Sequence, residues 1–253
     1  ISSLDNCYVF PLYRYEGKPR QQVGQEQLLG APHTPPSDED RVSNLSPGFV
    51  VEFERRLGLS FCSEGIGDLQ ETLGPEDILH YIYAILNSPT YRERYVEFLR
   101  IDFPRVPITS DRALFTVLVE KGAELVGLHL LESPAVNQVI TSYPVPGDNR
   151  IDRGHPRYIA PGQRAPARAE PLERGRVYIN KTQYIEGVEP EIWEFQIGGY
   201  QVLHKWLKDR KGRELSFDDL FHYQKVVVAL KETMRLMEEI DEVIEEHGGW
   251  PIE

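Results

Sequence analysis

The sequence predicts an α+β fold: a helical scaffold with a long C-terminal helix and a small β-sheet or hairpin portion. Apolar residues recur at helical spacing between Ser46 and Ser133, and again from about Ser216 to His247. Between these regions, residues 176–188 (RVYINKTQYIEGV) alternate between apolar and polar side chains, as the strands of a hairpin do. At 253 residues, the chain is long enough for one large domain or two small ones.

Proline and small polar residues mark where the individual helices begin. Proline suits the first helical position, because the N–H that it lacks would be unpaired there in any case. The pairs Ser46-Pro47, Gly74-Pro75 and Ser88-Pro89 each precede an apolar-periodic run, so they predict three helix starts. Asp111 is the expected N-cap of a fourth helix, which runs towards Ser133.

Strands and loops are expected elsewhere in the chain. Residues 6–15 (NCYVFPLYRY) are aromatic and β-branched, which predicts a strand broken at Pro11. Residues 17–45 and 143–175 are rich in proline and polar side chains and lack helical periodicity, so we expect long loops there. The acidic run Asp38–Asp40 lies in the first of them and is expected to be solvated charge.

The composition indicates the cellular compartment that we expect for this protein. Hydrophobic residues make up 40% of the chain, mean hydropathy is -0.42, and no apolar run approaches a membrane span of about 20 residues. We therefore expect a soluble, cytoplasmic protein with no membrane partner. Cys7 and Cys62 are the only cysteines, which favours a reducing compartment, and the scattered histidines predict no metal site. The N-terminus carries no secretory signal and no methionine, which suggests a piece of a longer polypeptide.

Charge is distributed unevenly along the chain. A formal net charge of -12 argues against a stand-alone DNA-binding domain, because contacts from Lys and Arg to phosphate supply much of the affinity for DNA. However, acidic residues gather on the outer face of the C-terminal helix, while residues 143–181 are rich in arginine. A net acidic protein can still present one basic surface. The candidate DNA-binding residues are Arg150, Arg153, Arg157, Tyr158, Arg164, Arg168, Arg174, Arg176 and Lys181.

The arginine-rich segment is open to two interpretations. Arginine forms bidentate contacts with phosphates and guanine edges, and the prolines around it stiffen an extended loop. Stretches of this composition also occur as flexible, solvated linkers. Charge alone does not decide between a DNA-contacting loop and a linker.

No catalytic motif is present, so the chain by itself is not expected to be an enzyme. It contains no GxSxG elbow, no HExxH helix and no NPPY tetrapeptide. Gly198 and Gly199 lack the spacing of a phosphate-binding loop and predict a tight turn with positive φ. We expect this turn to let a strand that ends at Ile197 pack closely on a helix that begins near Gln201. Gly199→Val would then unfold or misfold the domain instead of abolishing binding selectively.

Several phrases together resemble a known family. They are YVFPLY at 8–13, YIYAILNSP at 81–89 followed by Tyr91-Arg92 and Tyr95, FPRVP at 103–107, and WEF, IGGY, KWL and DR between 193 and 210. The chain is similar, from Asn6 to about Ile244, to the C-terminal target-recognition (specificity) region of type ISP restriction-modification enzymes and related N6-adenine-specific DNA methyltransferases.

The resemblance implies a role for residues 1–253 as a whole. The chain would be the recognition part of a longer methyltransferase polypeptide, with double-stranded DNA and the upstream methyltransferase domain as its partners. S-adenosylmethionine would bind in the parent's catalytic domain, and no cofactor is expected in this chain. The helices would form a stiff scaffold, residues 150–181 would meet DNA, and the acidic C-terminal helix would face away from it.

Two other classes of function remain open. The chain could be a protein–protein coupling domain that docks on the methyltransferase or on another subunit through the C-terminal helix. It could also be an enzyme with an unrecognised site. A basic patch formed by the arginines of 150–181 would favour DNA recognition, and an exposed apolar stripe on the C-terminal helix would favour coupling. A deep pocket with paired carboxylates would favour an enzyme.

Overall fold

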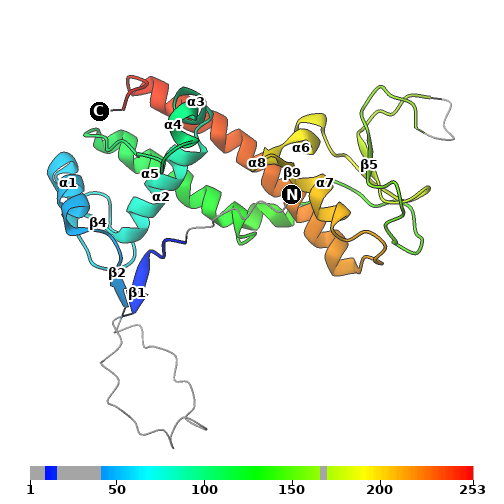
Figure 1. Cartoon of the computed structure of the whole chain (residues 1–253), viewed down its shortest axis with the longest axis horizontal. Helices are drawn as coiled ribbons and strands as arrows, with labels where there is room; N and C mark the ends of the chain where they lie inside the picture. The colour runs from blue at the N-terminus through cyan, green and yellow to red at the C-terminus, as the bar shows by residue number, and fades with distance from the viewer. Residues whose placement is uncertain (1–8, 16–40, 166–169, 253) are drawn as a thin grey trace, which may run out of the picture. The chain divides into compact units, whose positions relative to one another are not determined.

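The computed structural model describes residues 9–15, 41–165 and 170–252, which form two compact units (Figure 1). Unit 1 holds the chain up to Ala123 and again from Ile240, and unit 2 holds Glu124–Glu239. The α+β class is confirmed, since the helices are accompanied by small sheets of two or three strands. The long C-terminal helix is also confirmed, as α8 (Phe217–Glu246). Most of the first predicted loop, including Asp38–Asp40, lies outside the described residues.

Unit 1 begins with a short antiparallel ladder. Strand β1 (Tyr13–Tyr15) pairs with β2 (Arg41–Ser43). The segment 41–43 is therefore a strand and not the end of a loop that reaches residue 45. Tyr13 fixes this ladder to the helices because its hydroxyl donates to Glu76 Oε1 at 3.1 Å. A second, parallel pair joins β3 (Ser60–Phe61) to β4 (Thr72–Leu73).

The predicted helix starts of unit 1 are confirmed. Helices α1 (Pro47–Leu57), α2 (Pro75–Asn87) and α3 (Pro89–Arg94) each begin at the expected proline. Ser88 caps α3, since its Oγ accepts from the Tyr91 N–H at 3.0 Å. The run TYRERYVEFLRIDF (90–103), which follows Ser88-Pro89 and predicts one continuous helix, is interrupted. Tyr95 leaves helical geometry at φ -107° and ψ 17°, and α4 covers only Val96–Leu99.

Aromatic rings and one glycine hold the helices of unit 1 together. The rings of Phe53, Tyr81 and Phe115 are buried and lie within 5.9 Å of one another between centroids. Helix α5 (Arg112–His129) packs on α2 at Gly122, where an added Cβ would lie 1.9 Å from the His80 carbonyl oxygen. The predicted N-cap of α5 is confirmed, because Asp111 Oδ1 accepts from the Ala113 N–H at 2.8 Å.

The sheet of unit 2 contains the predicted hairpin and one further strand. Strands β6 (Arg176–Tyr178) and β7 (Tyr184–Glu186) pair antiparallel, as the alternation in 176–188 predicts. Strand β5 (Arg157–Ile159) pairs with the other edge of β6, and a 3-10 turn, η3 (Pro134–Asn137), precedes the sheet. The expected loop 143–175 is therefore partly a strand. Its apolar residues, among them the buried Ile151 and Leu172, tie the segment to the core.

Three helices cover the core of unit 2. Helices α6 (Pro190–Glu194), α7 (Val202–Lys208) and the first part of α8 enclose a cluster that includes Trp193, Leu203, Leu207 and Tyr223. The run Trp193, Phe195 and Ile197 predicts the strand that ends at Ile197, but Trp193 lies in α6 and only Gln196–Ile197 is extended. The signal for this short helix is Glu189-Pro190, the same proline-based start that marks α1 to α3.

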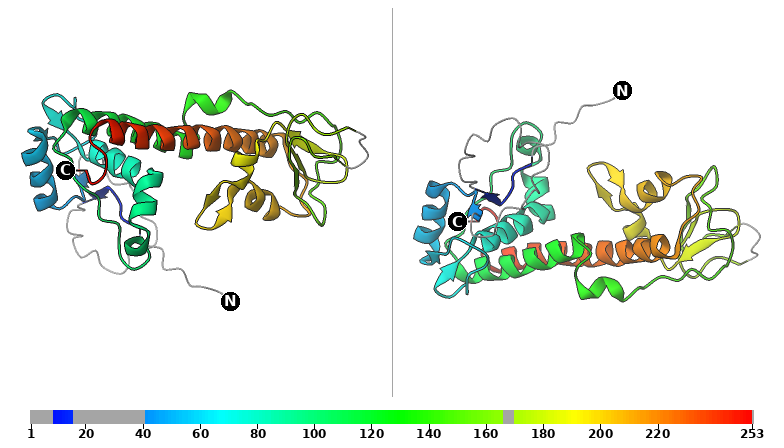
Figure 2. Two further views of the ribbon diagram at one scale, coloured as in Figure 1. Left: turned by 90° about the horizontal axis from the view of Figure 1, so that it is seen from above. Right: turned by 90° about the horizontal axis from the view of Figure 1, so that it is seen from below.

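The double glycine forms the turn of a hairpin. Strands β8 (Gln196–Ile197) and β9 (Tyr200–Gln201) pair around Gly198 and Gly199, whose φ values are 58° and 80°. The predicted positive φ is therefore confirmed. The predicted close packing is wrong, because a Cβ added at either glycine would meet no atom within 4 Å. Figure 2 shows this hairpin (yellow to gold) extending away from α8 beside α7.

None of the described helices is long and apolar enough to cross a membrane. Within the described residues, no group of three His, Cys, Asp or Glu side chains is placed to hold a metal ion. Cys62 is a half-buried free thiol that donates to the Leu73 carbonyl at 3.3 Å, and burial raises its pKa. Cys7 lies outside the described residues.

Candidate nucleic-acid interface

The predicted DNA-binding residues fall into three groups. Six of them are exposed on unit 2: Arg150, Arg153, Arg157, Arg164, Arg174 and Lys181. Arg176 is buried and Tyr158 is half-buried. Arg168 lies outside the described residues. Six of the nine are therefore placed where a phosphate backbone could reach them.

The side chain of Arg176, on strand β6, is buried. Its side chain is only 7% exposed, and its Nη2 and Nε lie 2.6 and 2.8 Å from Glu186 Oε1. The guanidinium also lies 4.1 Å from the centre of the Tyr184 ring. Arg176 thus joins β6 to β7, and its charge is already paired. Counting charge along the sequence cannot separate it from the exposed arginines, because the count does not show which face of a strand is buried.

Tyr158 supports the scaffold. Its ring stacks on Trp193 with centroids 5.2 Å apart and planes 16° apart, and its hydroxyl donates to the Val188 carbonyl at 3.0 Å. Burial raises the pKa of Tyr158 to about 12. The residue holds β5 against α6, so its neighbour Arg157, which is exposed, is carried on a rigid strand.

Two basic segments that are distant in sequence meet in unit 2. The Ile151 N–H donates to the Arg213 carbonyl at 3.1 Å, and the Gly212 N–H donates to the Ile151 carbonyl at 2.9 Å. Ile151 is 1% exposed and anchors this ladder in the core. As a result, Arg150, Arg153 and Lys211 line one open pocket of about 390 Å³.

Lysines continue from this pocket along α7. Lys205, Lys208 and Lys211 are three residues apart, and the turn persists beyond the end of α7 because the Lys211 N–H donates to the Lys208 carbonyl at 3.3 Å. Side chains at this spacing lie on one side of a helix. We call Arg150, Arg153 and these three lysines the basic surface of unit 2.

The lysine part of this surface is not among the residues predicted from the sequence to bind DNA. Residues 204–213 read HKWLKDRKGR, and this density of positive charge was the available signal. Two of these cations are engaged locally: Lys205 pairs with Asp209 at 2.7 Å, and the Arg210 guanidinium lies 3.7 Å from the centre of the Trp206 ring. Lys208 and Lys211, by contrast, make no ion pair with any carboxylate among the described residues.

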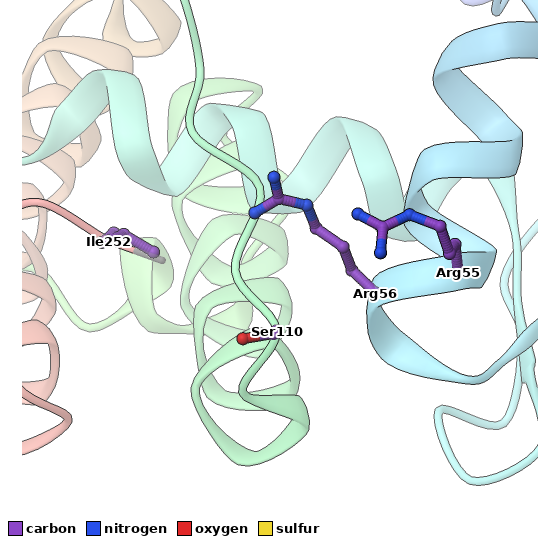
Figure 3. Close-up of a pocket in the computed structure, with 4 residues that line it drawn as sticks. All are labelled: Arg55, Arg56, Ser110 and Ile252. Atoms are coloured by element: carbon purple, nitrogen blue, oxygen red, sulfur yellow. The ribbon is translucent and has the colours of Figure 1, made fainter.

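Two arginines of unit 1 line a separate pocket of about 570 Å³ with Ser110 and Ile252 (Figure 3). Arg55 and Arg56 share Glu52, whose Oε1 lies 2.7 Å from Arg55 Nη2 and 2.6 Å from Arg56 Nε. Hydrogen bonds from Arg55 and Arg56 lower the pKa of Glu52 to about 2. Arg56 also donates to the Ile108 carbonyl at 2.6 Å. Arg56 therefore fastens α1 to the segment before α5.

Exposed apolar side chains gather elsewhere in unit 1. Phe98, Ile101 and Phe103 are 68%, 82% and 57% exposed, and they line a pocket of about 610 Å³ formed by residues 91–107. We call this region the apolar surface of unit 1. The exposed stripe considered for the C-terminal helix is not found, since Phe217 is the one large apolar side chain exposed on the described residues of α8. Each of the four pockets described in this chain has at most one carboxylate in its lining.

Three solved structures resemble this chain at low sequence identity, and the first two share its fold. The ATP-dependent Type ISP restriction-modification enzyme LlaBIII bound to DNA is 16% identical, with a TM-score of 0.55 over 91% of this chain and 14% of its own. A DrdV–DNA complex is 21% identical, with a TM-score of 0.52 over 82% of this chain and 20% of its own. A nuclease-deletion mutant of the Type ISP enzyme LlaGI with a DNA substrate mimic is 20% identical, with a TM-score of 0.45 over 65% of this chain and 13% of its own.

The match at the level of the family is broader. This chain spans between 13% and 20% of the length of those solved chains. No curated protein matches it significantly. The family described as the Type ISP C-terminal specificity domain matches residues 1–239, nearly the whole chain, and confirms the resemblance drawn from the sequence. The chain therefore belongs to the Type ISP C-terminal specificity domain family.

Proposed function

We propose that this chain recognises duplex DNA for a Type ISP restriction-modification enzyme and contacts it through the basic surface of unit 2. The observation that carries the proposal is the ladder between Ile151 and Arg213, which brings Arg150, Arg153 and Lys211 around one pocket. Membership of the specificity-domain family supports it, as does the fold shared with LlaBIII and DrdV, both of which were solved with DNA.

The net negative charge is compatible with this role. At physiological salt the Debye length is about 8 Å, so exposed charges farther away than this are largely screened. A bound phosphate therefore interacts mainly with the cations close to it and much less with the net charge of the whole chain. Lys208 and Lys211 make no ion pair among the described residues, so contact with DNA would not first have to break one. Phosphate contacts of this kind orient a protein on the duplex, and base-edge contacts then select the sequence.

The catalytic step belongs, in our proposal, to the longer polypeptide. Methylation of an adenine N6 amine requires the base to leave the stack, which needs a protein that holds the flanking duplex. A specificity domain would supply that grip. The methyltransferase domain and its S-adenosylmethionine would lie upstream, as the C-terminal position in the family name and the small fraction of the solved chains that this domain spans both suggest.

Binding to mixed-sequence duplex DNA across a salt series tests the proposal. Each phosphate contact contributes a slope of about -0.9 to log K against log[salt]. Replacing Arg150, Arg153 and Lys211 by alanine should flatten the slope by about 2 to 3 units. The matched control replaces Arg94, Arg100 and Arg105 of unit 1, which removes equal charge from exposed positions.

Two outcomes would contradict the proposal. Wild-type protein that does not bind the duplex even at low salt would show that this domain has no DNA-contacting surface of its own. Equal flattening by the unit 1 control would show attraction by overall charge instead of contact at the basic surface of unit 2.

The apolar surface of unit 1 favours a second, compatible role in docking the upstream polypeptide. Exposed apolar patches of this kind mark contact sites for protein, and Phe10 already lies edge-on to Phe103 with centroids 5.6 Å apart. Phe98→Ser with Ile101→Ser should weaken binding of this chain to the separately produced upstream region by at least about 10-fold, measured by calorimetry. Phe217→Ser, which removes an equally exposed ring from unit 2, is the control. Equal affinity of all variants would exclude docking at this surface.

A further inference from the structure

The tip of the β8–β9 hairpin exposes two large side chains. Ile197 and Tyr200 face each other as a cross-strand pair, and they are 56% and 62% exposed. Side chains of this size that lie together on a protruding element are typical of contact sites. The hairpin therefore presents an apolar tip to the surroundings of unit 2.

The hairpin is held stiffly at its base. The Val202 N–H donates to the Phe195 carbonyl at 3.3 Å, and both side chains pack against the core of unit 2. At the tip, the positive φ values of Gly198 and Gly199 match the turn whose twist suits a two-residue hairpin. Ile197 and Tyr200 are thus presented by a short element anchored at both ends.

Positive charge flanks this tip. The Lys205 ammonium lies 5.5 Å from the centre of the Tyr200 ring, and Lys208 lines the same pocket of about 320 Å³. The remaining lining side chains are polar: Gln196, Gln201, His204 and Asp209. Because Lys205, Lys208 and Lys211 lie on one side of α7 and the turn that follows it, the hairpin adjoins the basic surface of unit 2.

We propose that the hairpin tip inserts Ile197 and Tyr200 between base pairs of the bound duplex while Lys208, which makes no ion pair among the described residues, contacts a flanking phosphate. The inference rests on the proposed function and adds an insertion site to it. An apolar pair beside lysines fits DNA, where stacked bases are apolar and the backbone is anionic. Proteins that insert apolar wedges in this way unstack a base step and kink the duplex, and an aromatic ring also stacks on the base that it exposes.

Two measurements separate insertion from phosphate contact. Tyr200→Ala should weaken binding to mixed-sequence duplex DNA by roughly 10-fold without changing the salt slope, because stacking releases no counterions. Tyr200→Phe should retain wild-type affinity, since the ring remains. Lys208→Ala should instead flatten the slope by about 0.9.

Unwinding of closed circular DNA gives the direct readout. A plasmid relaxed by topoisomerase in the presence of wild-type protein should change linking number, because an inserted side chain unwinds a base step. The variant with both Ile197→Ala and Tyr200→Ala should lose this effect, and Phe217→Ala should keep it. All three side chains are exposed, so thermal denaturation should show equal stability of wild type and variants.

The outcomes distinguish the two proposals. Wild-type protein that binds duplex DNA with a steep salt slope but does not unwind it would overturn insertion and leave DNA recognition standing. The same holds if Tyr200→Ala binds and unwinds as the wild type does. Absence of binding by the wild type would overturn both.

Discussion

Arg176 and Glu186 form an ion pair between two adjacent strands of the unit 2 sheet, with Arg176 Nη2 2.6 Å from Glu186 Oε1. The pair is largely removed from solvent, since the side chains are 7% and 23% exposed. Such a pair links stability to the presence of both partners, because either charge alone would be left poorly solvated. An arginine that looks like a DNA contact in the sequence is therefore a structural residue.

Arg176→Ala should lower the free energy of unfolding by about 2 to 4 kcal/mol, because it leaves the Glu186 carboxylate without its partner. Urea denaturation followed by circular dichroism measures the change. Arg157→Ala on the neighbouring strand removes an exposed guanidinium and should change stability by no more than about 0.5 kcal/mol. Equal stability of the two variants would contradict the structural role of Arg176.

Gly122→Ala should lower the free energy of unfolding by about 1 to 3 kcal/mol. The added methyl group would lie 1.9 Å from the His80 carbonyl oxygen, so α5 and α2 must move apart. Gly127→Ala in the same helix is the control, because its Cβ would meet nothing closer than 3.8 Å. That change should stabilise the protein by about 0.5 to 1 kcal/mol, as alanine does in a helix interior. Thermal denaturation of both variants is the measurement.

Gly199→Val should strain the hairpin but not unfold the domain, contrary to the expectation from sequence. The φ of 80° disfavours a β-branched residue, while the space around the position is open. The cost should be on the order of 1 to 3 kcal/mol and confined to the turn. Gly198→Asn should be nearly neutral, because asparagine tolerates this conformation in hairpin turns. Amide hydrogen exchange would show whether protection is lost only in residues 195–202 or throughout unit 2.

Asp68 should make stability depend on pH in the acid range. Backbone N–H groups of Glu71, Thr72 and Gln70 donate to its Oδ1 and hold its pKa below the ordinary value of 3.8. A carboxylate with a lowered pKa contributes stability above its unfolded value and loses that contribution as pH falls through the folded value. The melting temperature of the wild type should therefore fall more steeply below about pH 4 than that of Asp68→Asn. Parallel curves would exclude this role for the Asp68 carboxylate.

Tyr223→Phe should leave the protein equally stable or stabilise it by up to about 1 kcal/mol. The Tyr223 side chain is fully buried in unit 2, and its hydroxyl has no hydrogen-bond partner among the described residues. Removing an unpaired buried hydroxyl relieves its desolvation cost. Tyr223→Leu should destabilise, since it also removes the ring that packs 5.3 Å from Trp206 between centroids. Chemical denaturation of the two variants separates the contribution of the hydroxyl to stability from that of the ring.

The signals that were correct from sequence act over a few residues. Proline at the first helical position marked α1, α2 and α3, and Asp111 marked α5, because capping depends on adjacent backbone groups. The same rule applies to the five-residue helix α6, which begins at Pro190 after Glu189. The family was identified in a different way, from the order of short phrases along nearly the whole chain.

Tertiary structure alone decided which basic residues share a surface. The sequence by itself determined the α+β class, the long C-terminal helix, the double-glycine turn and the family. It could not show that the Arg176 side chain is buried and the Arg157 side chain exposed. Strands of three residues are too short for the alternation of apolar and polar side chains to show which face is buried. Nor could it bring Lys211 beside Arg153. Their place in one pocket depends on the anchoring of Ile151 in the core, where burial of apolar area joins segments that are far apart in the chain.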